Sequence, residues 1–388
     1  MPWKEGTIMD QRIEFVSRRL RGERLTDLCA EFGISEKTGK KFMARYRELG
    51  AGGLADQSRR PRSSPSRTPE AMTELIVAAR RAHPTWGPHK VKAILERQHS
   101  TKLPAPSTIG DILKRHGLVE PRKRRRCAPR PTPLADAAAP NDVWCIDYKG
   151  EFRLHRSSSY CHPLTLSDQF SRYLLGCDGF SRISTDDAQE ACTDAFRRYG
   201  LPIWMRSDNG PPFASTALAG LSTLSVWWLR LGIKLQRIEP GKPQQNGRHE
   251  RMHRTLKRET TRPPAPNLLQ QQERFDDFVD EYNHRRPHQA LDMRTPAELY
   301  APSSRAFPVR LDDPEYPLHD DALTVHRCGH IQVGRRSYFL TKALAHQIVG
   351  IREEDDGRWL VSFLAADLGH IDLQLRQFVP IELLPPQS

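Results

Sequence analysis

Three carboxylates stand out in the sequence because of their surroundings. Asp147 lies inside the apolar run VWCID, where an unpaired charge would be costly to bury. Asp208 follows the run IWMRS in an Asp-Asn-Gly turn, and Glu250 lies early in the basic stretch GRHERMHRTLKRE. If two of these segments are neighbouring strands and the third is a helix packed across them, the three side chains converge. Close carboxylates repel one another unless a dication neutralises them, so we expect two Mg²⁺ or Mn²⁺ ions that act at phosphorus.

Alternating strand-like and helical segments are expected to position these acids. Short β-type runs bounded by Gly, Pro and Asp occur in residues 141–152, 163–180, 201–210 and 232–240, and helical stretches lie between and after them. This alternation predicts an α/β sheet covered by helices, which forms a catalytic core over residues 141–302.

The chain before this core has the pattern of two all-α helix-turn-helix modules, in residues 1–60 and 66–120. In the second helix of the first module, Phe42, Tyr46 and Leu49 are expected to face inward. The opposite face would enter the major groove of DNA through Lys37, Thr38, Lys40, Lys41 and Arg45. A plain three-helix bundle with a solvated basic face is the alternative. Gly39 lowers the stability of this helix by about 1 kcal/mol relative to alanine.

A basic linker, residues 121–140, separates the second module from the core. Its charge could track a phosphate backbone, although a solvated linker is the simpler interpretation. The bases concerned are Arg122, Lys123, Arg124, Arg125 and Arg126. After the core, residues 303–388 hold several short β-type runs that predict a small β-barrel domain.

Whole-chain properties favour a nucleic-acid partner. The 388 residues carry a formal net charge of +13, with no apolar run long enough to span a membrane and no secretory signal. The seven cysteines form no CxxC pair, which favours reduced thiols in a cytoplasmic protein over a zinc finger or a disulfide framework.

Four segments resemble the successive motifs of one family. WCIDYKGEF, RSDNGPPF, EPGKPQQNGRHERMHRTLKRE and YNHRRPHQALDMRTPAELY are similar to those of bacterial insertion-sequence transposases of the DDE retroviral-integrase superfamily. The resemblance implies a ribonuclease H-like core and a metal-dependent polynucleotidyl transferase whose DDE acids match Asp147, Asp208 and Glu250. It also implies DNA integration and recombination during transposition, in the bacterial nucleoid.

The spacing departs from the commonest integrase pattern, because 41 residues separate Asp208 from Glu250. We interpret the excess as an insertion near LSVWWLRLG. Glu239 is the other nearby candidate for the third acid, although its place before a proline at a strand end makes it the poorer choice.

The helix that carries Glu250 is expected to hold DNA as well as metal. Arg254 and Lys257 share its face at i+4 and i+7, and the resemblance places DNA contacts there. The alternative is a purely structural role, in which Glu250 and Arg254 form a surface salt bridge. Gln245 and Asn246 would place amide side chains near the DNA end. For His284, Arg285, Arg286 and His288, DNA contact and a capped helix end are equally good interpretations.

These patterns predict a transposase that binds double-stranded DNA at terminal inverted repeats, cleaves the element ends and joins the 3′-hydroxyls to target DNA. Pairing two ends implies a homodimer or higher oligomer. The competing hypotheses are a DNA-binding regulator with a catalytically silent core and a ribonuclease H-type nuclease without strand transfer.

Overall fold

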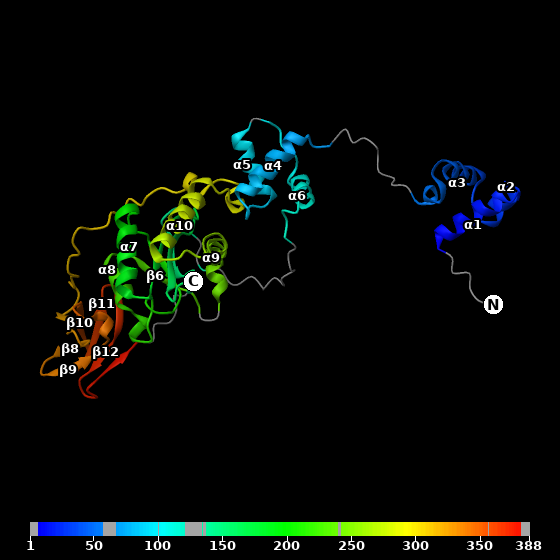
Figure 1. The fold of residues 1–388 in the computed structure, drawn as a ribbon. Helices are drawn as coiled ribbons and strands as arrows, with labels where there is room; N and C mark the ends of the chain where they lie inside the picture. Colours follow the sequence, from blue (N-terminus) through cyan, green and yellow to red (C-terminus); the bar gives the residue numbers. More distant parts are fainter. Residues whose placement is uncertain are drawn as a thin grey trace. The chain divides into compact units, whose positions relative to one another are not determined.

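The computed structural model describes residues 7–56, 67–99, 101–120, 134, 137–239, 242–355 and 357–381 (Figure 1). The chain divides into two compact units, Met1–Thr68 and Pro69–Ser388. The predicted DNA contacts of the linker, Arg122 to Arg126, lie outside the described residues and stay a prediction.

The first unit is a small helical domain. Its helices are α1 (Ile8–Leu20), α2 (Leu25–Glu31) and α3 (Glu36–Leu49). Ser35 caps α3 by accepting a hydrogen bond from the backbone N–H of Thr38, which satisfies a donor that the helix leaves free. The short helix α2, the turn and the basic helix α3 follow in the predicted order.

Helix α3 packs more tightly than its sequence suggests. A Cβ at Gly39 would lie 2.7 Å from the Cys29 Sγ and 2.9 Å from the Phe15 ring, so the glycine allows α3 to approach α1 and α2 closely. The inward prediction was wrong for Leu49, which is 58% exposed. Leu54, from the 3₁₀ turn that follows α3, is in the core instead.

The second unit begins with a module of three helices. These are α4 (Glu70–Ala82), α5 (Pro88–Gln98) and α6 (Pro106–Arg115). Proline at the first turn of α5 and α6 suits a helix start, because its missing N–H would have no intrahelical partner there. The core of the module contains Trp86 and Val91 along with Ile109 from α6.

A mixed sheet forms the centre of the second unit. Its strands are β1 (Val143–Tyr148), β2 (Phe152–Arg153), β3 (Tyr160–Asp168), β4 (Leu174–Phe180), β5 (Trp204–Ser207) and β6 (Lys234–Arg237). The strand order is β2-β3-β1-β5-β6, with β4 paired to β3. Strands β1, β5 and β6 run parallel, and β3 is antiparallel to β1.

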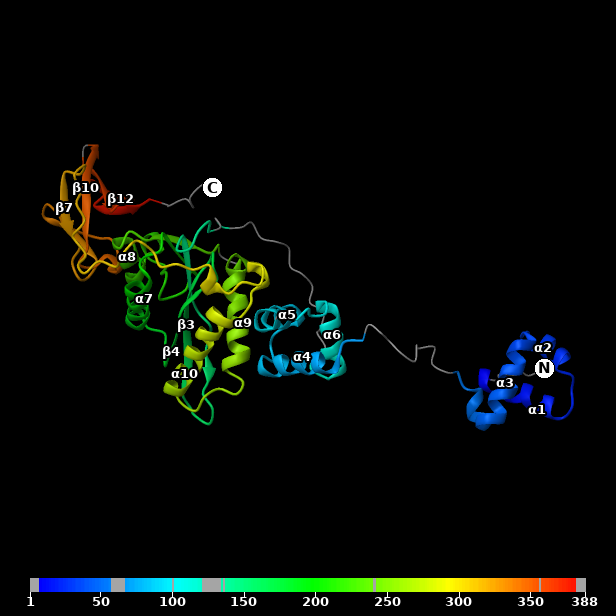
Figure 2. The same ribbon diagram turned by 90° about the horizontal axis from the view of Figure 1, so that it is seen from above.

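Helices cover both faces of this sheet (Figure 2). They are α7 (Thr185–Tyr199), α8 (Thr223–Arg230), α9 (Gly247–Thr260) and α10 (Leu268–Asp280). Trp144 and Ile146 of β1 pack against α7 and α8. Because side chains alternate along a strand, Cys145 and Asp147 lie on the opposite face, toward α9. The predicted α/β core is therefore present.

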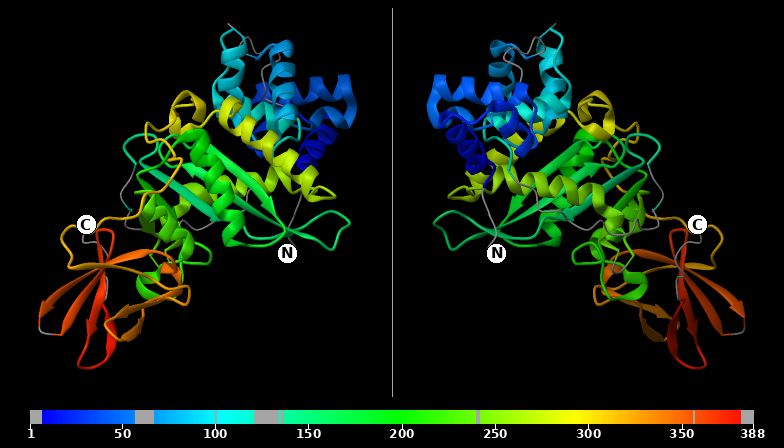
Figure 3. Two further views of the ribbon diagram at one scale, coloured as in Figure 1. Left: turned by 90° about the vertical axis from the view of Figure 1, so that its left-hand side faces the viewer. Right: turned by 90° about the vertical axis from the view of Figure 1, so that its right-hand side faces the viewer.

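The C-terminal part is all β (Figure 3), and its core also includes Leu221 and Val226 from the segment that contains α8. Its strands are β7 (Asp321–Thr324), β8 (His330–Val333), β9 (Arg336–Phe339), β10 (Ile348–Asp355), β11 (Arg358–Phe363), β12 (Ala366–Asp372) and β13 (Gln377–Pro380). They form a sheet in the order β13-β12-β11-β10-β7 and a separate β8-β9 pair. The part after the core is all β, as predicted, but closure into a barrel is not seen in the described residues. None of the helices described is both long and apolar enough to cross a bilayer.

Candidate active site

Two of the three predicted acids lie at the same edge of the central sheet. Strands β1 and β5 are parallel, and Cys145 pairs with Arg206. Two residues further in the same register, Asp147 is level with Asp208, which directly follows β5. The backbone N–H of Gly210 donates to Asp208 Oδ1 at 3.1 Å, so the turn fixes this carboxylate.

Helix α9 carries the third acid, Glu250. Its buried face, which includes Met252 and Leu256, packs against the sheet, while Glu250 in the first turn is exposed. The pKa of Asp147 is raised to about 7, mainly by burial and further by the negative charges of Asp208 and Glu250. The charge of Lys149 opposes this shift. The charges of Asp208 and Glu250 therefore both reach Asp147, although the carboxylate oxygens of the three acids do not all lie within 4.8 Å of one another in this conformation.

Glu239, the alternative third acid, is engaged elsewhere. Its carboxylate accepts hydrogen bonds from Lys242 and from the Gln245 amide, and these bonds lower its pKa. Gln245 also accepts from the backbone N–H of Glu239 at 2.9 Å. The amide that was expected near DNA therefore holds its own loop together in this conformation. Asn246 is buried directly before α9.

A buried cluster of hydrogen-bonded polar side chains under α9 was not predicted from the sequence. The hydroxyl of Thr165, the residue paired with Asp147 in β3, lies 2.7 Å from His249 Nε2 and 2.6 Å from His253 Nε2. Ser167 Oγ lies 2.8 Å from His249 Nδ1. The only signal in the sequence was the i, i+4 spacing of the two histidines, which places them on one face of a helix.

Both histidines are neutral near pH 7. Burial lowers the pKa of His249 to about 3, and burial together with the neighbouring His249 and Lys149 lowers that of His253 well below its ordinary value. The 3.7 Å contact between His253 Nδ1 and Asp147 Oδ2 is therefore not an ion pair. Among the groups of three or more His, Cys, Asp and Glu side chains within the described ranges, only Asp147, His249 and His253 have ligand atoms that all lie within 4.8 Å of one another. These atoms could share a metal ion.

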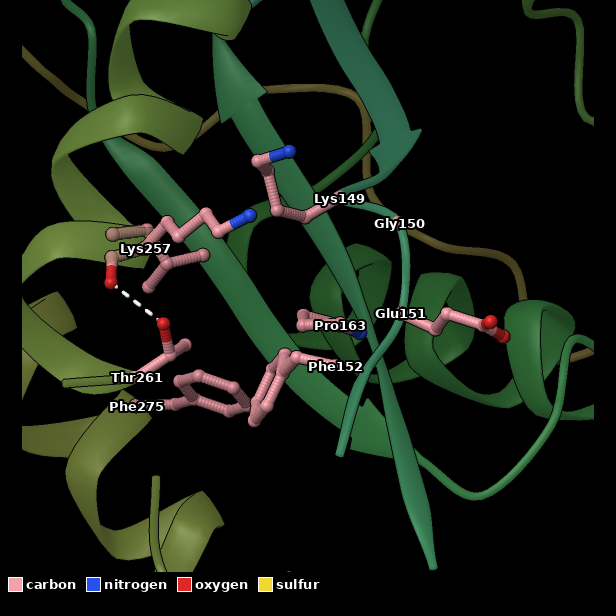
Figure 4. A pocket seen from close by; sticks show the side chains of 9 residues that line it. Lys149, Gly150, Glu151, Phe152, Pro163, Lys257, Thr261 and Phe275 are labelled. Atoms are coloured by element: carbon pink, nitrogen blue, oxygen red, sulfur yellow. Dashed lines mark hydrogen bonds between the residues drawn. The ribbon is translucent and has the colours of Figure 1, made fainter. Parts of the chain in front are cut away.

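Basic side chains flank the acids. Arg254 and Lys257 are exposed on the same side of α9 as Glu250, as predicted. Lys149, which the sequence analysis did not single out, follows β1 and lines a small cavity together with Lys257 (Figure 4). In Figure 4 the two ammonium groups, from different elements, lie on the same side of this cavity.

The predicted DNA-reading positions on α3 lie mostly on its surface. Lys37, Lys40 and Lys41 are exposed, while Thr38 and Arg45 are half-buried. Lys40 makes an i, i+4 contact with Glu36 at 3.5 Å. DNA contact by this face stays a prediction.

The segment after α10 joins the second helical module to the core. Arg286 is 4% exposed and forms an ion pair with Glu259 near the end of α9. Its guanidinium also donates to the Thr85 hydroxyl at 3.1 Å and lies over the Trp86 ring. Arg286 therefore has a structural partner, whereas its neighbours His284 and Arg285 are exposed.

Comparison with known proteins gives matches along most of the chain. Residues 137–243 and 231–296 match two family models that are both described as an integrase core domain. Residues 11–62 match a helix-turn-helix domain, and residues 38–113 match a homeodomain-like domain.

The similar proteins include products of bacterial insertion elements. The chain is 27% identical over 244 residues to an uncharacterized 31.7 kDa protein of insertion element IS407 from Burkholderia multivorans, which covers 62% of this chain and 84% of that protein. It is 26% identical over 296 residues to an uncharacterized 39.2 kDa protein of IS476 from Xanthomonas euvesicatoria, over 73% of this chain and 80% of that protein. The HTLV-2 integrase catalytic core domain, solved in complex with magnesium, aligns with 42% of this chain and 99% of that domain at 16% identity and a TM-score of 0.34.

Proposed function

Because this chain is a DDE transposase or integrase that joins helix-turn-helix domains to an integrase core domain, we propose that it moves a DNA element. It would bind the terminal inverted repeats, cleave the element ends and join the 3′-hydroxyls to target DNA. The proposed domains are residues 1–60, 66–120, 121–140, 141–302 and 303–388.

The observation that supports this proposal is that the charges of Asp208 and Glu250 both act on Asp147. The register of β1 and β5 also makes Asp147 level with Asp208. Carboxylate oxygens with open positions suit Mg²⁺ or Mn²⁺, and the exposure of Asp208 and Glu250 leaves the site accessible to DNA. Bound there, two divalent cations would polarise the attacking oxygen and stabilise the leaving one.

The reaction has two displacements at phosphorus. In the first, a water oxygen bonds to the scissile phosphorus at the element end, and the bond to the 3′-oxygen breaks. That oxygen takes up a proton and becomes a free 3′-hydroxyl. In the second, this hydroxyl loses its proton as its oxygen bonds to a phosphorus of the target, and the displaced target 3′-oxygen takes up a proton to become a hydroxyl. Asp147, Asp208 and Glu250 hold the reacting centre, and no covalent protein–DNA intermediate is needed.

The remaining basic residues would bind DNA. Arg254 and Lys257 lie beside Glu250 and would contact the phosphates next to the cut. The exposed face of α3 would read the terminal repeat, and the linker bases would follow the backbone between modules. Joining two ends to one target requires at least a dimer on DNA.

The test uses paired terminal-repeat DNA, a plasmid target and Mg²⁺ or Mn²⁺. We expect joined products from the wild-type chain. Cuts without joining would favour a ribonuclease H-type nuclease, and binding without cuts would favour a regulator; either result contradicts the proposal. The DNA that flanks the gene should supply the inverted repeats for the substrate.

A further inference from the structure

We propose that His253 Nδ1 is a nitrogen ligand to a divalent cation held by Asp147. The centre would then be a mixed oxygen and nitrogen site rather than an all-carboxylate one. This inference rests on the proposed function for the presence of a metal, but it concerns which atoms bind the ion and which ion they prefer.

The hydroxyl of Thr165 determines where the protons of both histidines lie. This hydroxyl lies 3.1 Å from the backbone carbonyl of Asp147, which can only accept, and close to the Nε2 atoms of His249 and His253. A hydroxyl has one hydrogen to donate. All these contacts are hydrogen bonds only if Thr165 donates to the carbonyl and both histidines donate to Thr165 through Nε2.

The second ring nitrogen of each histidine, Nδ1, then carries no proton. A neutral imidazole with a proton on Nε2 has a lone pair on Nδ1. The Nδ1 of His249 is satisfied by the Ser167 hydroxyl at 2.8 Å. The Nδ1 of His253 lies 3.7 Å from Asp147 Oδ2, which is too far for a hydrogen bond, so neither atom satisfies the other in this structure. Since both ring nitrogens of His249 are occupied, His253 is the available ligand.

The distance between His253 Nδ1 and Asp147 Oδ2 is suitable for a bound cation. Metal ions bind imidazole nitrogen and carboxylate oxygen at about 2.0–2.2 Å, so a cation fits between donors at this separation. His253 is 4% exposed and held by Thr165, which makes it a preorganised ligand. The hydrogen bond on its second nitrogen is the arrangement found around metal-bound histidines. The charge of Lys149 acts on both side chains and offsets part of the attraction for the cation.

The ligand type determines the ion. Imidazole nitrogen suits transition-metal ions, whereas Mg²⁺ takes oxygen ligands and retains water. Mn²⁺ is the transition-metal ion that also suits carboxylate oxygen, so a mixed nitrogen and oxygen site favours Mn²⁺ over Mg²⁺.

The test is Mn²⁺ binding to the full chain without DNA, followed by electron paramagnetic resonance. We expect electron spin echo modulation from a directly coordinated ¹⁴N in the wild type. That modulation should disappear in His253→Asn, with about a 10-fold loss of Mn²⁺ affinity and little change for Mg²⁺. The matched control, His249→Asn, should keep the nitrogen signal.

A measurement on the wild type keeps the test independent of whether the variants fold. Labelling histidine with ¹⁵N should convert the ¹⁴N modulation into that of ¹⁵N. Bound Mn²⁺ without nitrogen coupling, coupling that survives in His253→Asn, or no Mn²⁺ binding would each overturn the proposal. Failure of the proposed function can be told apart from failure of this proposal. In the first case the chain would not join DNA, but the spectrum of its bound Mn²⁺ would still show coupling to an imidazole nitrogen.

Discussion

Arg286 and Glu259 form a buried ion pair that also includes the hydroxyl of Thr85. Glu259 belongs to α9, which carries Glu250, and Thr85 belongs to the connection between α4 and α5. The pair therefore links the helix of the candidate active site to the second helical module.

Removing Arg286 should loosen this link. Arg286→Ala leaves the Glu259 carboxylate partly buried without its partner, at an expected cost of about 3 kcal/mol. Urea unfolding and hydrogen exchange in residues 69–120 would measure the loss. Arg285→Ala is the matched control, since its pair with Asp280 is 3.1 Å long and the Arg285 side chain is 69% exposed. We expect a cost below about 1 kcal/mol for it; equal losses would contradict the structural role of Arg286.

Replacing each of two helical glycines, Gly39 and Gly110, by alanine should change the stability of the protein in opposite directions. Helix propensity alone predicts that either substitution stabilises by about 1 kcal/mol. A Cβ at Gly39 would lie 2.7 Å from Cys29 Sγ, so Gly39→Ala should instead destabilise by about 1–3 kcal/mol. At Gly110 in α6 the nearest atom, on Pro88, is 3.5 Å away, so Gly110→Ala should stabilise. Thermal unfolding of both variants checks this, and a gain at Gly39 would refute the close packing of α3.

Asp178 should make stability depend on pH. Burial, followed by the charges of Asp276 and Asp194, raises its pKa from 3.8 to about 6. Because the folded-state pKa is above the unfolded one, its stabilising contribution is complete below about pH 4 and is lost as the pH rises through 6. Asp178→Asn should therefore stabilise the protein by about 2 kcal/mol at pH 8 and have little effect at pH 4.

Denaturant unfolding at the two pH values measures the difference. Asp313→Asn serves as the control, because that side chain is 76% exposed, and it should change little at either pH. A pH-independent effect of Asp178→Asn would show that charge burial is not the cause.

The two candidate third acids can be separated by matched variants. Glu250→Gln should reduce cleavage and joining about 1,000-fold or more while DNA affinity stays within about threefold, since it removes a proposed metal ligand and not the bases that grip phosphate. Glu239→Gln should retain most activity, because Glu239 bonds within its loop. A gel assay with labelled element ends, together with fluorescence anisotropy, reads both quantities. Loss of activity only in Glu239→Gln would transfer the role to that residue.

Sequence reasoning identified the elements that local patterns determine. The acid within an apolar strand, the Asp-Asn-Gly turn and the i, i+4, i+7 face of α9 are all periodic or compositional signals. The register of β1 and β5 makes Asp147 level with Asp208, while the place of Glu250 in a metal site stays a prediction. The buried cluster of Thr165 with His249 and His253 was missed, because helical spacing places the histidines beside Met252 and Leu256 but does not identify the strand residue that they contact. The packing at Gly39 was missed because helix propensity describes one helix and not its neighbour.

The contact through Thr85 would also fix the distance along DNA between the site that the second helical module binds and the bond that is cut. Helix α6 and Glu250 belong to parts of the chain that this contact joins, so a base sequence bound by that module would be held at a set number of base pairs from the severed bond. Weakening the contact would then show itself as scattered cut positions, even where the speed of cutting is unchanged.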